Sequence, residues 1–197
     1  MPRLFVGLEL TPDIAFALSL KRGGLTGARW IDTEKFHITL RFIGDVCDRT
    51  ADQVVGELDR IDREPFEISL GNLDTFASRK PHSLWASVQP NADLMSLQID
   101  VERAVRRAGL EPDSRKFTPH VTLARLKGST HEDVARYLTE RGEFQSLPFK
   151  VDEFVLLSSR KGTGGGPYIV EERFALYEDD AHEAYFEDDY VSLSSSF

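Results

Sequence analysis

Two short segments of this 197-residue chain carry the same pattern of chemically active side chains. In each, a histidine and a threonine two positions apart alternate with apolar residues, which predicts a β-strand with one face in the core. The histidine and the threonine then share the opposite face, where an imidazole can transfer a proton and a hydroxyl can donate a hydrogen bond to a phosphate oxygen. The pairs are His37 with Thr39, in residues 36–42 (FHITLRF), and His120 with Thr122, in residues 120–125 (HVTLAR). One such strand would be ordinary, but its recurrence indicates one shared site.

Two imidazoles on opposite sides of a phosphorus atom suit in-line phosphoryl transfer. One neutral histidine takes a proton from the attacking water, and one protonated histidine gives a proton to the leaving oxygen. Histidine serves both roles because its ordinary pKa of about 6.5 lets both forms coexist near neutral pH. The threonine hydroxyls and a nearby arginine can stabilise the charge that grows on the non-bridging oxygens. This chemistry requires neither a metal ion nor another cofactor.

The elements that position these groups follow from hydrophobic periodicity and from turn residues. Strands are predicted over residues 3–10, 28–31, 36–42, 66–77, 83–89, 120–125, 149–158 and 168–177. Helices are predicted over residues 12–21, 51–61 and 92–108, and residues 128–130 are predicted to cap a short helix that runs to about residue 141. Each histidine strand therefore lies between helices and is followed by further strands, which predicts an α+β fold.

The two halves of the chain correspond beyond the histidine strands. His37 and His120 are 83 residues apart, the Pro-Phe pair at 65–66 recurs 83 residues later, and the Ser-Arg-Lys turn at 78–80 recurs at 159–161. Three matches in one order at nearly one offset indicate a two-fold duplication, in which two lobes bring the histidines to opposite sides of one cleft. We expect residues 1–177 to form a single bilobal catalytic domain with a His37 half and a His120 half.

The net charge of −9 argues against broad electrostatic binding to nucleic acid. Residues 178–197 hold seven acidic side chains and no Lys or Arg, which predicts an acidic tail outside the domain. The rest of the chain is nearly neutral and could accept one phosphate group. The single cysteine, Cys47, excludes an intramolecular disulfide, and no apolar run reaches membrane-spanning length. We expect a monomeric cytoplasmic protein with no membrane contact.

The paired His-x-Thr motifs resemble those of the 2H phosphoesterase superfamily, and more closely its RNA 2′,3′-cyclic phosphodiesterases, also called 2′-5′ RNA ligases. The resemblance extends over nearly all residues up to about 177. It includes RLFVGLEL at 3–10, Trp30 ahead of FHITLRFIG, the LW of HSLWASV at 82–88, FTPHVTLAR at 117–125 and LLSSR at 156–160.

The resemblance implies a bilobal duplicated fold, with two antiparallel sheets facing each other across a central cleft and helices on the outside. It implies hydrolysis of a terminal RNA 2′,3′-cyclic phosphate to a 2′-phosphate, and in reverse 2′-5′ ligation. In that family, the residues matching His37 and His120 are the acid–base pair, and those matching Thr39 and Thr122 donate to the phosphate. Arg125 matches a further phosphate ligand.

Strand parity raises a difficulty for Arg125. In a regular strand it faces away from His120 and Thr122, so a bulge or the strand end would have to re-aim it. Arg41 has the parity of His37 and is the reserve candidate for a phosphate ligand. Phe42 has core parity, which favours packing over stacking on a base, and Trp30 is a second candidate for stacking. His82, in a basic turn, is a possible substrate contact.

Two other interpretations stay open. The site could bind a nucleotide phosphate with little turnover, or it could open a cyclic phosphate on a small nucleotide. The glycine-rich segment 162–166 does not read as a phosphate-binding P-loop, because no Gly-Lys-Ser/Thr follows and a strand comes next. The basic turns at 78–80 and 159–161 could flank the cleft.

Overall fold

The computed structural model describes residues 3–76, 80–159 and 168–177. Its strands are β1 (Arg3–Glu9), β2 (Ala28–Trp30), β3 (His37–Asp45), β4 (Phe66–Ile68), β5 (Leu70–Thr75), β6 (Ser83–Val88), β7 (His120–Leu126), β8 (Phe149–Val151), β9 (Glu153–Ser159) and β10 (Tyr168–Ala175). Its helices are α1 (Pro12–Ser19), α2 (Asp48–Leu58), α3 (Ala92–Arg107) and α4 (His131–Arg141), with a 3₁₀ turn η1 (Thr33–Lys35). Each predicted helix and strand is present. The predicted strands over 66–77 and 149–158 are each divided into two. The acidic tail, the glycine-rich segment and most of both Ser-Arg-Lys turns lie outside the described residues.

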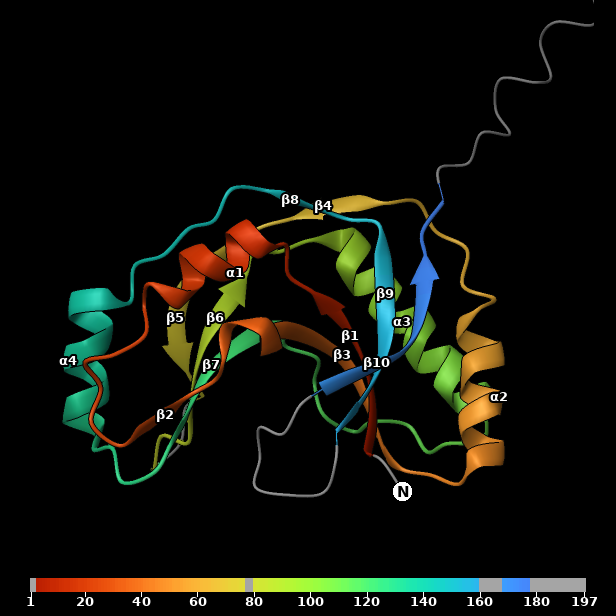
Figure 1. The fold of residues 1–197 in the computed structure, drawn as a ribbon, viewed down its shortest axis with the longest axis horizontal. Helices are drawn as coiled ribbons and strands as arrows, with labels where there is room; N and C mark the ends of the chain where they lie inside the picture. Colours follow the sequence, from red (N-terminus) through yellow and green to blue (C-terminus); the bar gives the residue numbers. More distant parts are fainter. Residues whose placement is uncertain (1–2, 77–79, 160–167, 178–197) are drawn as a thin grey trace, which may run out of the picture.

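The strands of both halves join one antiparallel sheet with β3 and β7 side by side at its centre (Figure 1). Its order is β10-β9-β1-β3-β7-β6-β5, and β2 also pairs with β7. The predicted α+β class and antiparallel pairing are confirmed. The resemblance implied two antiparallel sheets that face each other. In the structure these are joined into one sheet, because Ile38 of β3 pairs with Val121 of β7. This pairing covers the inner edge of each half, whose backbone groups would otherwise lack partners.

A second, two-stranded sheet connects the halves above the first. In it β4 pairs with β8, and Glu67 lies opposite Lys150. Both this pair and the pair of Ile38 with Val121 join residues 83 apart, which is the separation of the two histidine motifs. When two halves are related by a two-fold axis, strands that meet at the axis pair equivalent residues of the two halves. Both strand pairings therefore support the sequence repeat.

The repeat does not extend to every strand. β6 lies between β5 and β7, but the corresponding place between β9 and β3 is taken by β1, and β10 is added outside β9. The amino-terminal strand thus supplies the middle strand of one half. The strand that follows the second basic turn becomes an edge strand.

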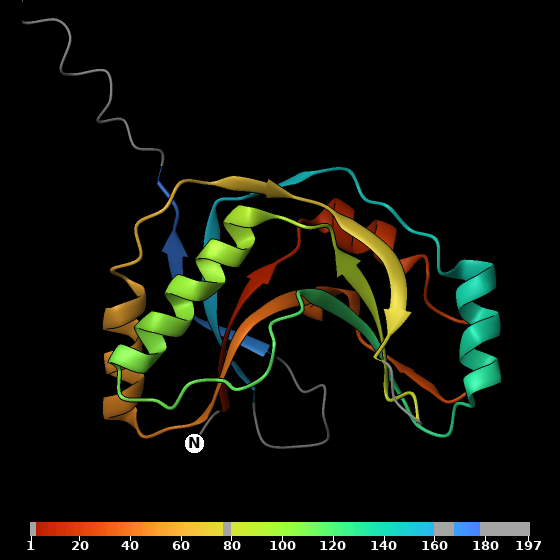
Figure 2. The same cartoon turned by 180° about the vertical axis from the view of Figure 1, so that it is seen from behind.

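The larger of two apolar clusters lies on one side of the large sheet. Helices α2 and α3 lie beside the half that contains β3, and α1 and α4 beside the half that contains β7 (Figures 1 and 2). Ile38 and Val121 are fully buried in this core together with Leu97 and Val101 of α3. Because side chains alternate along a strand, the neighbours of Ile38 and Val121 lie on the opposite face.

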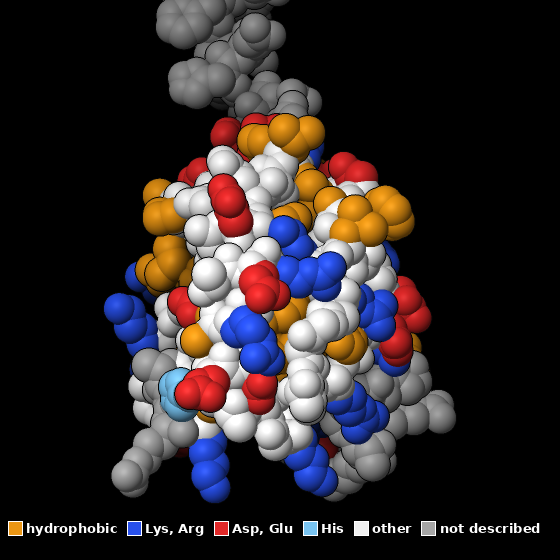
Figure 3. All heavy atoms as spheres, turned by 90° about the vertical axis from the view of Figure 1, so that its left-hand side faces the viewer, with side chains coloured by type: hydrophobic (Ala, Val, Ile, Leu, Met, Phe, Trp, Pro, Cys, Tyr) orange, Lys and Arg blue, Asp and Glu red, His pale blue; other side chains and the backbone are white. Residues whose placement is uncertain are grey.

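The surface on the α4 side carries both signs of charge. Lys and Arg side chains are interspersed there with Asp and Glu (Figure 3). This face of the described residues presents no continuous basic track of the kind that a long polyanion would need. None of the described helices is long and apolar enough to cross a membrane.

Candidate active site

The two histidine motifs meet where β3 crosses β7. The antiparallel pair of Ile38 with Val121 places Thr122 across from His37 and His120 across from Thr39. All four side chains are half-buried. Each imidazole therefore lies beside the hydroxyl of the other motif, and within the described residues neither hydroxyl has a hydrogen-bond partner.

Each imidazole is oriented by a backbone carbonyl two residues earlier. The His37 Nδ1 lies 2.8 Å from the Lys35 carbonyl oxygen, and the His120 Nδ1 lies 2.7 Å from that of Thr118. A carbonyl oxygen only accepts, so Nδ1 must carry the hydrogen in both rings. The neutral imidazoles then present an unprotonated Nε2, the nitrogen that can take a proton from a substrate group.

Aromatic rings surround both imidazoles. The ring centroid of His37 lies 5.0 Å from those of Phe5 and Tyr168. The rings around His120 are those of Phe76 at 5.1 Å and Trp85 at 5.6 Å. Such contacts restrict the rotation of each imidazole and exclude water from its faces. From the sequence alone, these aromatic residues would be expected to pack in the core. The order of the strands in the sheet shows that they contact the histidines instead.

Burial lowers the pKa of both histidines. For His37 burial is the main cause, partly opposed by the Lys35 carbonyl, and the charges of His120 and Arg125 lower the pKa further. Burial also lowers the pKa of His120, against the Thr118 carbonyl, and Arg125 adds to the effect. Both imidazoles are therefore mainly neutral at pH 7. The one that serves as an acid must gain its proton at lower pH or from the approach of an anionic substrate.

A β-bulge in β7 turns Arg125 toward this face. Leu84 pairs with Ala124 but Trp85 pairs with Thr122, so Leu123 is an extra residue on β7. Leu123 and Ala124 are both fully buried, and Arg125 is exposed on the histidine side. The bulge that the assignment of Arg125 needed is present. Within the described residues Arg125 forms no ion pair, while its charge lowers the pKa of both histidines.

A second bulge lies at the matching place in β3, and it overturns two predictions. Val6 pairs with Arg41 and Gly7 with Thr39, so Leu40 is the extra residue. Arg41 does not share the face of His37 as predicted: the bulge leaves its side chain only 9% exposed and bonded to Glu102 and Glu111, although it still lines the cleft described below. The predicted core position of Phe42 is wrong for the same reason, since its ring is 45% exposed.

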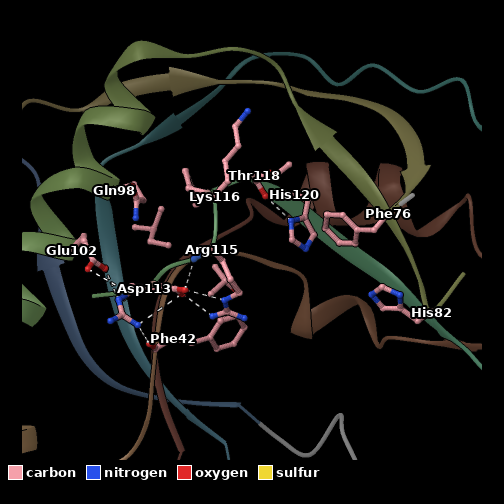
Figure 4. A pocket seen from close by; sticks show the side chains of 14 residues that line it. Phe42, Phe76, His82, Gln98, Glu102, Asp113, Arg115, Lys116, Thr118 and His120 are labelled. Atoms are coloured by element: carbon pink, nitrogen blue, oxygen red, sulfur yellow. Dashed lines mark hydrogen bonds and ion pairs between the residues drawn. The ribbon is translucent and has the colours of Figure 1, made fainter. Parts of the chain in front are cut away.

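A cleft of about 520 Å³ opens beside this crossing point (Figure 4). Thr39, Phe42 and His120 line it from the strands. His82 also lines the cleft, stacked on Phe76 with the rings 6.0 Å apart, so the structure brings this predicted contact near the motifs. Trp30 instead packs against Tyr137 of α4 and does not line the cleft.

The irregular segment 110–119, between α3 and β7, forms one wall of the cleft. Arg115 and Lys116 lie on this wall, and the Arg115 guanidinium stands 5.5 Å from the centre of the Phe42 ring (Figure 4). The sequence contains no recognisable motif that indicates this role for either residue. Within the described ranges, no group of three or more His, Cys, Asp and Glu side chains could hold a metal ion.

Comparisons with known proteins show which family the chain resembles. The family model of the 2′-5′ RNA ligase superfamily matches residues 27–163. The RNA 2′,3′-cyclic phosphodiesterase of Aquifex aeolicus is 30% identical over 186 residues, covering 88% of this chain and 97% of that protein. The protein of the same name from Aeropyrum pernix is 36% identical over 132 residues, 66% of this chain and 75% of that protein.

Solved structures show the same fold. E. coli LigT complexed with 3′-AMP has a TM-score of 0.71 at 23% identity and covers 90% of this chain and 100% of its own. The TT0787 protein of Thermus thermophilus has a TM-score of 0.73 at 23% identity, covering 88% of this chain and 97% of its own.

Proposed function

Because this chain belongs to the 2′-5′ RNA ligase superfamily, we propose that it hydrolyses RNA 2′,3′-cyclic phosphate ends to 2′-phosphates. The observation that carries the proposal is the pair of imidazoles at one strand crossing, His37 and His120, each with Nε2 free. Relatives named RNA 2′,3′-cyclic phosphodiesterase, which align along most of this chain, support the substrate class.

The reaction uses the two histidines as base and acid. The neutral one takes a proton from water through Nε2 while the water oxygen bonds to phosphorus. The bond from phosphorus to the 3′ oxygen breaks, and that oxygen receives the proton of the other histidine. Each histidine ends in the opposite protonation state, so proton exchange with solvent resets the pair before the next turnover. With an RNA 5′-hydroxyl in place of water as the nucleophile, the same steps would form a 2′-5′ linkage and release the 3′-hydroxyl.

Three further side chains stabilise charge on the non-bridging oxygens. Thr39 and Thr122 lie across from the two imidazoles, and their hydroxyls have no other partner among the described residues. Arg125 brings an uncommitted guanidinium to the same face. Donors that are already in place where negative charge grows lower the barrier without reorganising during the reaction.

The cleft suits a terminal nucleotide better than an internal stretch of RNA. A volume of about 520 Å³ lies in the usual range for small-ligand sites. The exposed ring of Phe42 on its wall can stack on a base. We further propose that residues 1–177 act as one bilobal catalytic unit, since each half supplies one histidine and one threonine.

The test is an assay with EDTA present, on a 2′,3′-cyclic-phosphate oligonucleotide and on the corresponding mononucleotide. We expect opening to the 2′-phosphate, and a loss of at least about 100-fold in His37→Ala and in His120→Ala. His131→Ala, at the start of α4, is the matched control and should keep the wild-type rate. Activity that survives both active-site substitutions, or that EDTA abolishes, would refute the mechanism. Tight binding without turnover would show a phosphate-binding module instead.

A further inference from the structure

The two carbonyls that orient the histidines are supported very differently. Lys35, which orients His37, ends the 3₁₀ turn η1, and its own N–H donates to Asp32 O at 2.9 Å. Thr118, which orients His120, belongs to the segment 110–119, which forms neither helix nor strand. A segment without regular backbone hydrogen bonds needs side-chain contacts to stay in one place. Leu110 and Phe117 of the segment pack against the core, and a set of polar contacts holds the residues between them.

Arg41 connects this segment to β3 and α3. Its Nε lies 2.5 Å from Glu102 Oε2 on α3, and its Nη2 donates to the Glu111 carbonyl at 2.5 Å. Its Nη1 donates to the Phe42 carbonyl and lies 3.9 Å from Asp113 Oδ2. The guanidinium is thus bonded in three directions at once. A lysine ammonium, a single point of charge, could not reproduce that arrangement.

Glu102 completes the connection with its other oxygen. Its Oε1 accepts the backbone N–H of Asp113 at 3.2 Å (Figure 4). Asp113 in turn accepts from the backbone N–H of Arg115 at 3.0 Å and pairs with the Arg115 guanidinium at 2.7 Å, which lowers the pKa of Asp113 to about 2. The contacts therefore run from the bulge in β3 through Asp113 to Arg115, three residues before Thr118.

We propose that Arg41 and Glu102 are positioning residues for His120. They hold residues 111–115 on β3 and α3, and this keeps the Thr118 carbonyl within reach of His120 Nδ1. If that carbonyl moves away, the imidazole can place its hydrogen on Nε2 instead, and the nitrogen that faces the substrate can no longer take a proton. The inference rests on the proposed function, in which His120 is one of the two proton-transferring groups.

Glu102→Gln tests the proposal with little change in shape. The amide oxygen of glutamine can still accept from Arg41 Nε, but its NH₂ group cannot accept from the Asp113 N–H. Asp100→Asn is the matched control, because Asp100 is on the same helix and pairs with Arg63 at 2.5 Å. The Asp100 side chain is 26% exposed and that of Glu102 is 20% exposed. Asp100 makes no contact with residues 110–119 among the described interactions.

Two measurements separate positioning from a loss of fold. Steady-state kinetics on a 2′,3′-cyclic mononucleotide should show kcat about tenfold lower in Glu102→Gln, since a tenfold change in the reactive tautomer corresponds to about 1.4 kcal/mol. The ¹⁵N NMR signals of the imidazoles should show His120 moving from the Nδ1–H form toward a mixture of tautomers. His37 in the same sample should keep its signals. Asp100→Asn should match the wild type in both measurements.

Several outcomes would overturn the proposal. They are a wild-type kcat and unchanged His120 signals in Glu102→Gln, or the same changes in Asp100→Asn. If Glu102→Gln does not fold, Asp113→Asn removes the charge pair with Arg115 while keeping its volume, and it should shift the His120 signals in the same direction. The NMR result does not depend on turnover. A wild-type protein without hydrolytic activity would therefore refute the proposed function and leave the positioning of His120 open to direct measurement.

Discussion

Replacing Arg125 should have two separable effects, because we propose that its guanidinium binds the phosphate, and its charge lowers the pKa of both histidines. Arg125→Gln removes the charge and one transition-state donor. Loss of one such donor in other enzymes costs about 100-fold to 1,000-fold in rate, or about 2.7–4 kcal/mol. Arg125 is exposed, so water screens its interaction with the phosphate. We therefore expect the lower end, a fall of about 100-fold in kcat/KM.

The sign of the pH effect follows from the same charge. A nearby cation disfavours the protonated imidazole, so its removal raises the pKa of His37 and of His120. The pH profile of kcat/KM for Arg125→Gln should therefore move to higher pH. Arg125→Lys keeps the charge but loses the planar fork, so it should lose rate while the profile stays in place.

The assay is hydrolysis of a 2′,3′-cyclic mononucleotide between about pH 4.5 and 8.5, a range that spans the ordinary histidine pKa. Arg136→Gln, on the exposed side of α4, serves as the control for loss of one positive charge. A kcat/KM within about threefold of the wild type would refute the role of Arg125 in the transition state. A profile that moves to lower pH would refute the electrostatic reasoning.

Three further predictions follow from the same contacts. Since the pKa of both His37 and His120 lies below the ordinary 6.5, wild-type kcat/KM should already fall as pH rises from 6.5 to 8, and a rise over that range would contradict the lowered values. Phe42→Ala should raise KM for a cyclic mononucleotide about tenfold and change kcat less, as expected for loss of stacking on a base, whereas an unchanged KM would place the base elsewhere. Arg41→Met should reduce the free energy of unfolding in urea at pH 7 by about 3 kcal/mol, because it leaves the half-buried Glu102 carboxylate without its ion pair, while Asp113 keeps its pair with Arg115. Arg63→Met, at a more exposed ion pair, should lower the free energy of unfolding by less. Equal decreases in the two variants would show that the burial of Arg41 does not add to its contribution to stability.

The sequence predicted the elements well because each depends on local pattern. Helix α3 was expected over residues 92–108 and spans Ala92–Arg107, and its amino end is capped by Asn91, whose side chain accepts from the Leu94 N–H. The short strands β4 and β8 were not separated from β5 and β9, because a one-residue break leaves alternation nearly intact. The joining of both halves in one sheet was not predicted, since strand pairing between distant segments leaves no trace in the pattern of either.

The predicted orientations of Arg41 and Phe42 failed where strand parity was extended past a bulge. Leu40-Arg41-Phe42 and Leu123-Ala124-Arg125 occupy matching places 83 residues apart, and in both strands two successive residues turn inward. Alternation within a single strand cannot show this, because the extra residue becomes visible only against the register of the neighbouring strand.

The two bulges together explain how one repeated motif yields two unlike halves of the histidine face. After each bulge, the next residue of the strand lies on the histidine face again. This residue is Phe42 in one half and Arg125 in the other. An aromatic ring suits a base, and a free guanidinium suits a phosphate. The inward-turned residues differ as well: Ala124 fills the core, and Arg41 holds the cleft wall. If Phe42 meets the base and Arg125 the phosphate, as we propose, exchanging the two residues should abolish hydrolysis of a 2′,3′-cyclic mononucleotide while leaving the strand pairing intact.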